Sequence, residues 1–402
     1  MSVTVNDIIE ARQTLNNVAY RTSLVHDEVL NEISGNQIYL KMENLQRTGS
    51  FKLRGAYNRI ANLTEEEKRQ GVIASSAGNH AQGVALAAQV HGIKATIVMP
   101  KHAPLSKVKA TKSYGAEVVL FGEMYDEAYA EAIRIQQKTN ATFIHPFNDP
   151  LVIAGQGTIG LEIIEDLPDA EIVVVPIGGG GLISGIATAI KNCKPGVKVI
   201  GVQARNMPSM LEAVHQNKII TIKGSSTIAD GIAVKTPGEV TFDIVRRYVD
   251  DIVTVDEDEI ASAILFLLEK MKIVSEGAGA VPLAAILNKF SQYRGKKIVA
   301  VISGGNIDVN MLSRIIDQGL VKSRRKIYCD TVIPDKPGTL WRLIKLVSDA
   351  GANIISITHK RDKRNVSIGY VYVELELETA DEEQIRLIGK LLGEHGYKVD
   401  LC

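Results

Sequence analysis

The stretch Glu171-Ile-Val-Val-Val-Pro-Ile-Gly-Gly-Gly-Gly-Leu182 decides the fold. Its first half is an apolar run of the length of a buried strand, and its second half is a glycine run that leads into a helix of small residues through Ile190. A strand followed at once by a helix is the repeating unit of a parallel α/β sheet. The sequence therefore predicts open, twisted parallel sheets with flanking helices. Similar apolar runs alternate with helical segments at 71–75, 95–100, 117–121, 141–144, 198–202, 251–255 and 297–302.

The glycine run, Gly178, Gly179, Gly180 and Gly181, predicts a phosphate site. Four glycines in succession leave the backbone N–H groups unshielded, and the N-terminus of the following helix adds partial positive charge. The alternative is a tight turn, which also uses glycine but needs fewer of them. No Gly-Lys-Ser/Thr follows and the spacing does not fit Gly-X-Gly-X-X-Gly, so neither an NTPase nor a dinucleotide is indicated. The remaining interpretation is that the glycine run binds the compact phosphate group of another cofactor.

A second stretch, Ser50-Phe-Lys-Leu-Arg-Gly55, contains a candidate nucleophile, Lys52. A lysine amine attacks near neutral pH only when partial burial or a neighbouring cation lowers its pKa. Phe51 and Leu53 supply apolar neighbours, and Arg54 supplies a charge. The alternative is that these are solvated surface charges, as most lysines and arginines are. A reactive lysine together with a phosphate cradle favours pyridoxal phosphate, whose aldehyde forms a Schiff base with lysine.

The bulk composition excludes several classes of protein. Basic and acidic residues both number 46 in 402, so the formal charge is zero and neither a nucleic-acid nor a membrane partner is expected. Cys193, Cys329 and Cys402 lie far apart without a Cys-X-X-Cys spacing, which favours neither a disulfide framework nor a zinc site. We find no signal-peptide pattern and no apolar run near the ~20 residues of a membrane span. We expect a cytoplasmic protein.

Beyond residue 320 the pattern changes. A basic linker at 321–325 precedes a third unit, in which strands and helices follow the order β-α-β-β-α-β through residue 402. This order predicts a ferredoxin-like domain.

The motifs at 41–56, 75–83, 178–182 and 303–306 together resemble those of the fold-type II pyridoxal-phosphate enzymes, and specifically the threonine/serine dehydratases (threonine ammonia-lyases). The resemblance covers about residues 5–320, and residues 326–402 resemble a single ACT regulatory domain, with Asp335-Lys-Pro-Gly-Thr-Leu340 as its signature. It implies a large cofactor-binding α/β domain from 1–48 and 150–320, a small substrate-side α/β domain from 49–149, the linker 321–325 and the ACT domain.

Roles for individual residues follow from the resemblance. Lys52 is implied to be the Schiff-base lysine, with Phe51 near the cofactor ring, Asn79 at the ring hydroxyl and Ser303 at the pyridine nitrogen. Because a neutral hydroxyl does not hold that nitrogen protonated, Ser303 favours elimination over transamination. The phosphate would contact the backbone of Gly178, Gly179, Gly180, Gly181 and Leu182, and the substrate carboxylate would contact Ser76, Ala77, Gly78, Asn79 and His80. For Ser76 and His80 alone, a helix cap and a structural histidine are equally good interpretations.

The implied reaction converts L-threonine to 2-oxobutanoate and ammonia, with L-serine giving pyruvate. Serine racemases are the nearest rival, but they present a serine where this chain has Ala77, and their metal-binding carboxylates are missing from 203–209. No metal is therefore expected, although Glu276 could lie near the cofactor or a cation, or simply begin a helix. A cysteine-synthase-like transferase is disfavoured by His80, and a non-catalytic amino-acid sensor by Lys52.

The resemblance to ACT domains implies regulation by a small amino acid, with isoleucine or valine as the expected effector, in a homodimer or homotetramer. A dimerisation module without a ligand is the alternative, because a fold alone does not assign a function.

Overall fold

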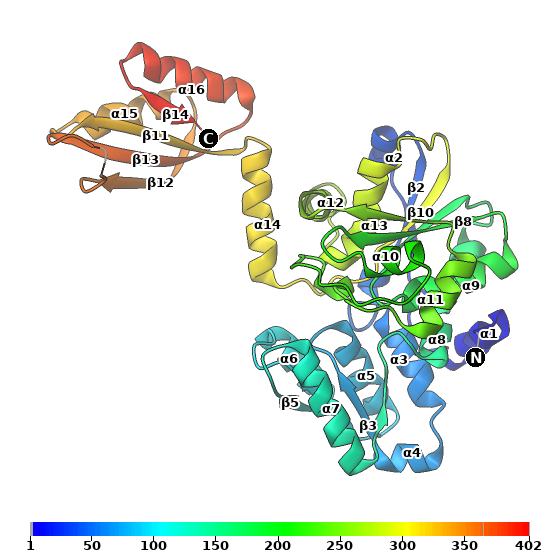
Figure 1. The fold of residues 1–402 in the computed structure, drawn as a ribbon. Coiled ribbons are helices and arrows are strands. Elements are labelled where there is room, and N and C mark those ends of the chain that lie inside the picture. Colours follow the sequence, from blue (N-terminus) through cyan, green and yellow to red (C-terminus); the bar gives the residue numbers. More distant parts are fainter. Residues whose placement is uncertain (1–2, 365, 402) are drawn as a thin grey trace. The chain divides into compact units, whose positions relative to one another are not determined.

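A computed structural model describes residues 3–364 and 366–401. The described chain forms two compact units, 1–308 and 309–402. The first contains two sheets and the second contains one (Figure 1). None of the described helices is long and apolar enough to span a membrane.

The larger sheet of the first unit has the strand order β1-β2-β10-β7-β8-β9. All neighbours are parallel except β1 and β2. Helices α8, α9 and α11 contribute to the core on one face, and α13 contacts β7, β8, β9 and β10. The strands are β1 (Leu24–His26), β2 (Gln37–Lys41), β7 (Ile172–Pro176), β8 (Lys198–Ala204), β9 (Asp251–Val255) and β10 (Lys297–Val301). The helices around this sheet are α1 (Val5–Thr14), α2 (Glu28–Ser34), α8 (Pro150–Asp166), α9 (Gly181–Cys193), α10 (Ser209–His215), α11 (Glu239–Tyr248), α12 (Glu257–Glu269) and α13 (Gly277–Lys289), with 3-10 turns at Glu43–Leu45 and Asp230–Ile232.

The smaller sheet is fully parallel, with the order β5-β4-β3-β6. Alternate strand residues point to opposite faces, so Ala74 and Ile97 pack with α3 and α5, while Ile73 and Val98 pack with α7. Its strands are β3 (Val72–Ser75), β4 (Ala95–Met99), β5 (Glu117–Leu120) and β6 (Thr142–Phe143). Its helices are α3 (Lys52–Ala61), α4 (Glu65–Gln70), α5 (Asn79–Val90), α6 (Leu105–Ser113) and α7 (Tyr125–Thr139). The predicted α/β class, with two open sheets, is confirmed.

Helix α8 is the longest of the described helices that the sequence patterns did not reveal; the others are α2, α4, α10, α11, α12 and α14 (Val309–Lys322). Twelve of its residues, Val152 to Ile163, are buried without interruption, so it has no polar face to produce a helical period. Its start is nevertheless well defined, because Pro150 occupies the first turn and the Asp149 carboxylate accepts hydrogen bonds from the next two free backbone N–H groups. Helix α8 contacts both α3 and α9 and so joins the two sheets' helical layers.

The second unit is the predicted βαββαβ domain. Its antiparallel sheet has the order β12-β13-β11-β14, formed by β11 (Lys326–Pro334), β12 (Asn353–Lys360), β13 (Tyr370–Glu378) and β14 (Val399–Leu401). Helices α15 (Thr339–Asp349) and α16 (Glu382–Glu394) share its core. The unit also includes helix α14 (Val309–Lys322). The sequence assigned residues 309–320 of this helix to the large domain and its last two residues to the linker 321–325.

Candidate active site

Lys52 is the first residue of α3, and its surroundings lower the pKa of its amine. Its Nζ donates a hydrogen bond to the Pro146 carbonyl oxygen (2.9 Å) and lies 5.2 Å from the centre of the Phe51 ring. Desolvation by the surrounding protein lowers the pKa of Lys52 to about 8, although the carboxylate of Glu276 opposes this effect. A substantial fraction of the amine is therefore neutral near physiological pH. Arg54 does not contribute to this lowering, contrary to the expectation from sequence.

The start of α3 is attached to the end of β10. The Phe51 N–H donates to the Ser303 carbonyl oxygen (3.1 Å), and Ser50 forms an isolated bridge with Gly304. Ser303 itself is buried, with 2% of its surface exposed. Two of the predicted site residues, Phe51 and Ser303, are thus held directly together beside Lys52.

The glycine run lies between β7 and α9 and has no room for side chains. A Cβ added to Gly179 would lie 2.5 Å from carbons of the Phe147 ring, and Gly180 has φ +96°, which favours glycine. The Thr241 hydroxyl donates to the Gly179 carbonyl oxygen (2.6 Å), so this carbonyl is already engaged. Helix α9 has no side-chain N-cap, which leaves its first N–H groups available for an anion. Phe147 follows Pro146, the hydrogen-bond partner of Lys52, so the same segment borders both the glycine run and the lysine.

A chain of polar side chains surrounds Asn79. Asn306 donates to Asn79 Oδ1 (2.8 Å), and Asn79 Nδ2 donates to Glu276 Oε1 (2.6 Å). Glu276 precedes α13 but makes no N-cap hydrogen bond, so its side chain is directed to Asn79 and not to the helix end. Burial and the nearby Asp230 raise the pKa of Glu276 to about 7. The carboxyl can therefore take up or release a proton near neutral pH.

The loop before α5 presents open space next to a helix N-terminus. No atom lies within 4 Å of a Cβ added to Gly78, and α5 has no side-chain N-cap. The Gly78 N–H donates to the Ser76 hydroxyl (3.2 Å), so Ser76 shapes the loop. His80 is buried and its Nε2 lies 2.8 Å from the Ile144 carbonyl oxygen. Burial and the nearby Lys52 lower the pKa of His80 to about 3, so this imidazole is neutral.

These features fit pyridoxal phosphate. The site combines a lysine with a lowered pKa, a glycine cradle that a Cβ would fill, and a helix N-terminus without a cap. Ser50 and Ser75 add buried hydroxyls without a hydrogen-bond partner in the described chain. Lys52 would hold the aldehyde carbon and Gly178–Leu182 the phosphate.

Comparisons with known proteins identify the family of this chain. A model of the pyridoxal-phosphate dependent enzymes matches residues 15–304, and a model of the ACT domain matches residues 330–386. The chain belongs to the pyridoxal-phosphate dependent enzymes. An L-threonine ammonia-lyase of Thermotoga maritima is 60% identical over 99% of both chains, and a catabolic L-threonine dehydratase of Escherichia coli K12 is 51% identical over 78% of this chain and 96% of its own.

Solved structures of this family are similar as well. Threonine deaminase isoform 2 from Solanum lycopersicum is 40% identical, covers 78% of this chain and 92% of its own, and has a TM-score of 0.75. Maize serine racemase is 35% identical, covers 81% of this chain and all of its own, and also has a TM-score of 0.75. The predicted family, fold, cofactor class and ACT domain are confirmed.

The sequence patterns missed several residues of this pyridoxal-phosphate enzyme site. Pro146 acts through its carbonyl and Thr241 through a hydroxyl on a distant helix, and neither use leaves a sequence signal. Asn306 lies in a quoted motif, but its contact with Asn79 depends on the loop after β10 lying against the loop before α5. The individual roles implied for Lys52, Asn79, Ser303, the glycine run and the 76–80 loop remain predictions.

Proposed function

We propose that this chain is a cytoplasmic L-threonine ammonia-lyase, which converts L-threonine to 2-oxobutanoate and ammonia and acts on L-serine as a secondary substrate to give pyruvate. The observation that carries this proposal is the likeness over nearly its full length to an L-threonine ammonia-lyase, 60% identical over 397 residues. The buried amine of Lys52 beside the glycine cradle supplies the chemistry that such a reaction needs.

When bound, pyridoxal phosphate supplies an electron sink for negative charge at the substrate α-carbon. Lys52 supplies the base, because an amine with a pKa near 8 can accept the α-proton at Nζ and return it later. The Pro146 carbonyl fixes the direction of that amine. The uncapped N-terminus of α5 can bind the substrate carboxylate through the backbone N–H groups that begin at Asn79.

Glu276 supports the base. Its carboxyl lies close enough to Lys52 to raise the pKa of the amine, and its own pKa of about 7 is also set partly by Lys52. A proton taken up by the lysine is therefore stabilised by a neighbouring carboxylate. Asn79 and Asn306 hold this carboxylate in place through consecutive hydrogen bonds.

A serine racemase is the second candidate, because the maize enzyme is similar in structure. Racemisation needs a second proton donor on the opposite side of the α-carbon from Lys52. The loop at Ala77 carries a methyl group where the racemases are expected to present a hydroxyl. This difference favours one-way elimination.

The test is to measure keto-acid formation from L-threonine, L-serine and D-serine in parallel, with Lys52→Ala as the control. We expect 2-oxobutanoate from L-threonine at the highest rate and none from Lys52→Ala. Appreciable formation of D-serine from L-serine would favour the racemase. A purified holoenzyme that releases no keto acid from L-threonine would refute the proposal.

We also propose that isoleucine or valine changes the activity through the ACT domain, in a homodimer or homotetramer. The match of residues 330–386 to the ACT family supports this regulation. Deletion of residues 326–402 is expected to abolish the response and to spare catalysis. Identical responses of the full-length and shortened forms to every amino acid would contradict the proposal.

A further inference from the structure

Helices α3 and α8 cross at unusually short range a few residues from Lys52. A Cβ added to Gly55 would lie 2.7 Å from the Val152 carbonyl oxygen, and one added to Gly155 would lie 2.4 Å from the Arg54 carbonyl oxygen. The two backbones are therefore in contact, with a glycine from each helix at the crossing. Contact of this kind fixes the distance between the helices but resists their rotation only weakly, because glycines have no side chains to interlock.

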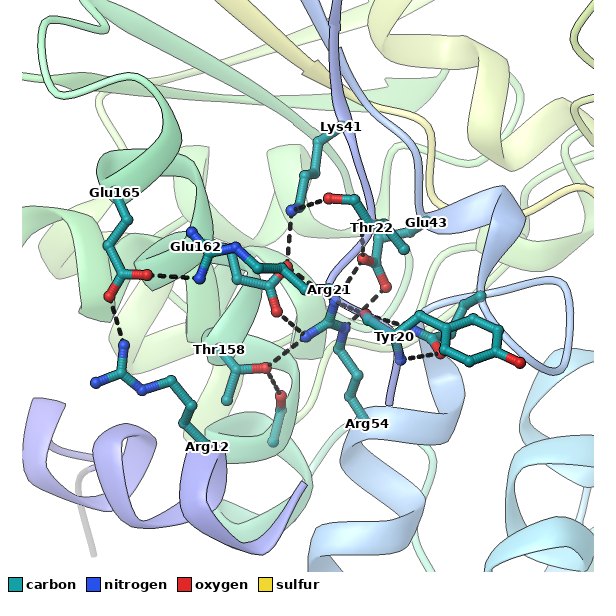
Figure 2. Close-up of polar contacts among 12 residues, drawn as sticks. Arg12, Tyr20, Arg21, Thr22, Lys41, Glu43, Arg54, Thr158, Glu162 and Glu165 are labelled. Atoms are coloured by element: carbon teal, nitrogen blue, oxygen red, sulfur yellow. Dashed lines mark hydrogen bonds and ion pairs between the residues drawn. The ribbon is translucent and has the colours of Figure 1, made fainter. Parts of the chain in front are cut away.

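Arg54 supplies most of the directional contacts at this crossing (Figure 2), and Asn58 adds a hydrogen bond to the Leu151 carbonyl oxygen (2.8 Å). Only 1% of the Arg54 surface is exposed. Its guanidinium lies between Glu43, which follows β2, and Glu162 of α8. It donates to Glu43 Oε2 (2.9 Å) and Oε1 (2.8 Å), and to Glu162 Oε1 (2.6 Å) and Oε2 (3.0 Å). Further hydrogen bonds reach Thr158 Oγ1 (3.1 Å) and the Tyr20 carbonyl oxygen (3.0 Å).

The charges of this cluster are balanced. Lys41 is fully buried, and its Nζ lies 2.7 Å from Glu162 Oε2 and 2.6 Å from the Thr22 carbonyl oxygen. Two buried cations thus face two buried carboxylates, and the half-buried Asp166, 3.8 Å from Lys41 Nζ, is itself paired with Arg21. Burial alone would lower the pKa of Arg54, but Glu43 and Glu162 raise it above the ordinary value, so the guanidinium stays charged.

Stability alone does not account for such a cluster. Replacing a buried ion pair by apolar residues of similar volume is often neutral or even stabilising, because the cost of desolvating the charges offsets their attraction. What the guanidinium provides is geometry, since its planar fork accepts only a narrow range of carboxylate positions. Arg54 lies in the first turn of α3, and this helix has no side-chain N-cap. Among the described residues, Arg54 is therefore the side chain of that turn with the most extensive fixed contacts.

We propose that Arg54 is a positioning residue, which holds the first turn of α3 in the orientation that places the Lys52 amine against the Pro146 carbonyl. Glu43 and Glu162 act as the fixed points of this arrangement, one from each side of the guanidinium. Without these contacts, α3 keeps its packing against α5 and the hydrogen bond from Asn58 to the Leu151 carbonyl, but its first turn loses the side-chain contacts that fix its orientation, and the amine shifts. The inference rests on the proposed role of Lys52 as the cofactor-binding base.

The test is Arg54→Lys in the full-length holoenzyme, because lysine keeps the charge but cannot contact both carboxylates in two places each. A misplacement of a catalytic group by about 1 Å can cost about 100-fold in rate. We expect kcat to fall about 10- to 100-fold, with KM changed less than about threefold. We also expect the pH midpoint of pyridoxal-phosphate capture, followed by absorbance, to rise, because an amine that leaves the buried position is better solvated.

Arg59→Lys is the matched control. Arg59 lies on the same helix and also pairs with α8, through Asp149 (3.0 Å), but at a more exposed position beyond the crossing. We expect its kcat and capture midpoint to match those of the unmodified protein. If Arg54→Lys is not recovered folded, Thr158→Val replaces it, because this change removes one hydrogen bond of Arg54 and no charge. We then expect kcat to fall about threefold and the pH midpoint of pyridoxal-phosphate capture to rise, as expected for Arg54→Lys.

A purely structural role gives a different result. Arg54→Lys would then melt at a lower temperature but keep the capture midpoint and a kcat within about twofold of the unmodified protein, and this outcome would overturn the proposal. An equal change in Arg59→Lys would overturn it as well. Failure of the role proposed for Lys52 gives a result of its own. In that case Lys52→Ala, with no other change, would still capture the cofactor.

Discussion

Replacement of Gly179 by alanine tests the cradle directly. The added Cβ would lie 2.5 Å from three carbons of the Phe147 ring, whereas carbon atoms in contact normally lie about 3.5–4.0 Å apart. Either the ring or the glycine loop must therefore move by about 1 Å. A shift of that size takes an N–H···O distance from about 2.9 Å to nearly 3.9 Å, which is too long for a hydrogen bond.

The expected loss of affinity follows from the charge of the phosphate. A hydrogen bond to a charged group contributes about 1.5–3 kcal/mol, and each 1.4 kcal/mol changes a dissociation constant about tenfold. Loss of one such bond should weaken the binding of pyridoxal phosphate about 10- to 100-fold. The measurement is a titration of the cofactor-free protein, followed by the absorbance of the bound cofactor.

Two comparisons make this result specific. Pyridoxal, which lacks the phosphate, should bind Gly179→Ala and the unmodified protein with similar affinity, because Lys52 is unchanged. Gly196→Ala is the control substitution, since nothing lies within 4 Å of a Cβ at that position. Two results would show that the phosphate does not bind at the glycine run. In the first, folded Gly179→Ala binds pyridoxal phosphate with an affinity within about twofold of the unmodified protein. In the second, the substitution weakens the binding of pyridoxal as much as that of pyridoxal phosphate.

Three further predictions concern the lysine, the carboxyl and the helix crossing. Capture of pyridoxal phosphate should accelerate with pH around a midpoint near 8, because the neutral amine attacks the aldehyde and the pKa of Lys52 is lowered to about 8; a midpoint above about 10, near that of a solvated lysine, would contradict burial of the amine. Glu276 has a pKa raised to about 7, so its contribution to stability is present at low pH and is lost as the pH rises through 7. The free energy of unfolding of Glu276→Gln, measured in urea relative to that of the unmodified cofactor-free protein, should therefore rise by about 2 kcal/mol from pH 5 to pH 8. The same difference between the two proteins at both pH values would refute this. Gly155→Ala should lose about 1–3 kcal/mol, because its Cβ would overlap the Arg54 carbonyl; a melting temperature equal to that of Gly196→Ala would show that the helices have room.

Local patterns predicted many of the strands and helices, although the amphipathic helices α11 and α14 were not among them. Residues 37–41, 125–139 and 251–255 occur as a strand, a helix and a strand within the expected bounds. Helix α8 escaped prediction because both its sides are buried, so its hydrophobic residues have no period. Some residues of the candidate site were likewise visible in the sequence and others were not. The glycine run and Lys52 stand out by composition, whereas Pro146 and Thr241 make contacts that only the folded chain creates.

The neighbours of Lys52 show why adjacency in sequence was misleading. Arg54, two positions later, was expected to lower the pKa of the amine as a nearby cation, but residues two apart on a helix point in different directions. Its guanidinium faces Glu43 and Glu162, and this pairing neutralises the charge that would otherwise act on Lys52. Desolvation sets the pKa of Lys52 instead, and Glu276 opposes it. A cation beside the lysine would also repel the protonated amine that forms when Lys52 accepts a proton, whereas a carboxylate stabilises it. The separation of the two charges thus lets one turn of α3 contain both a fixed cation and a base that titrates near neutral pH.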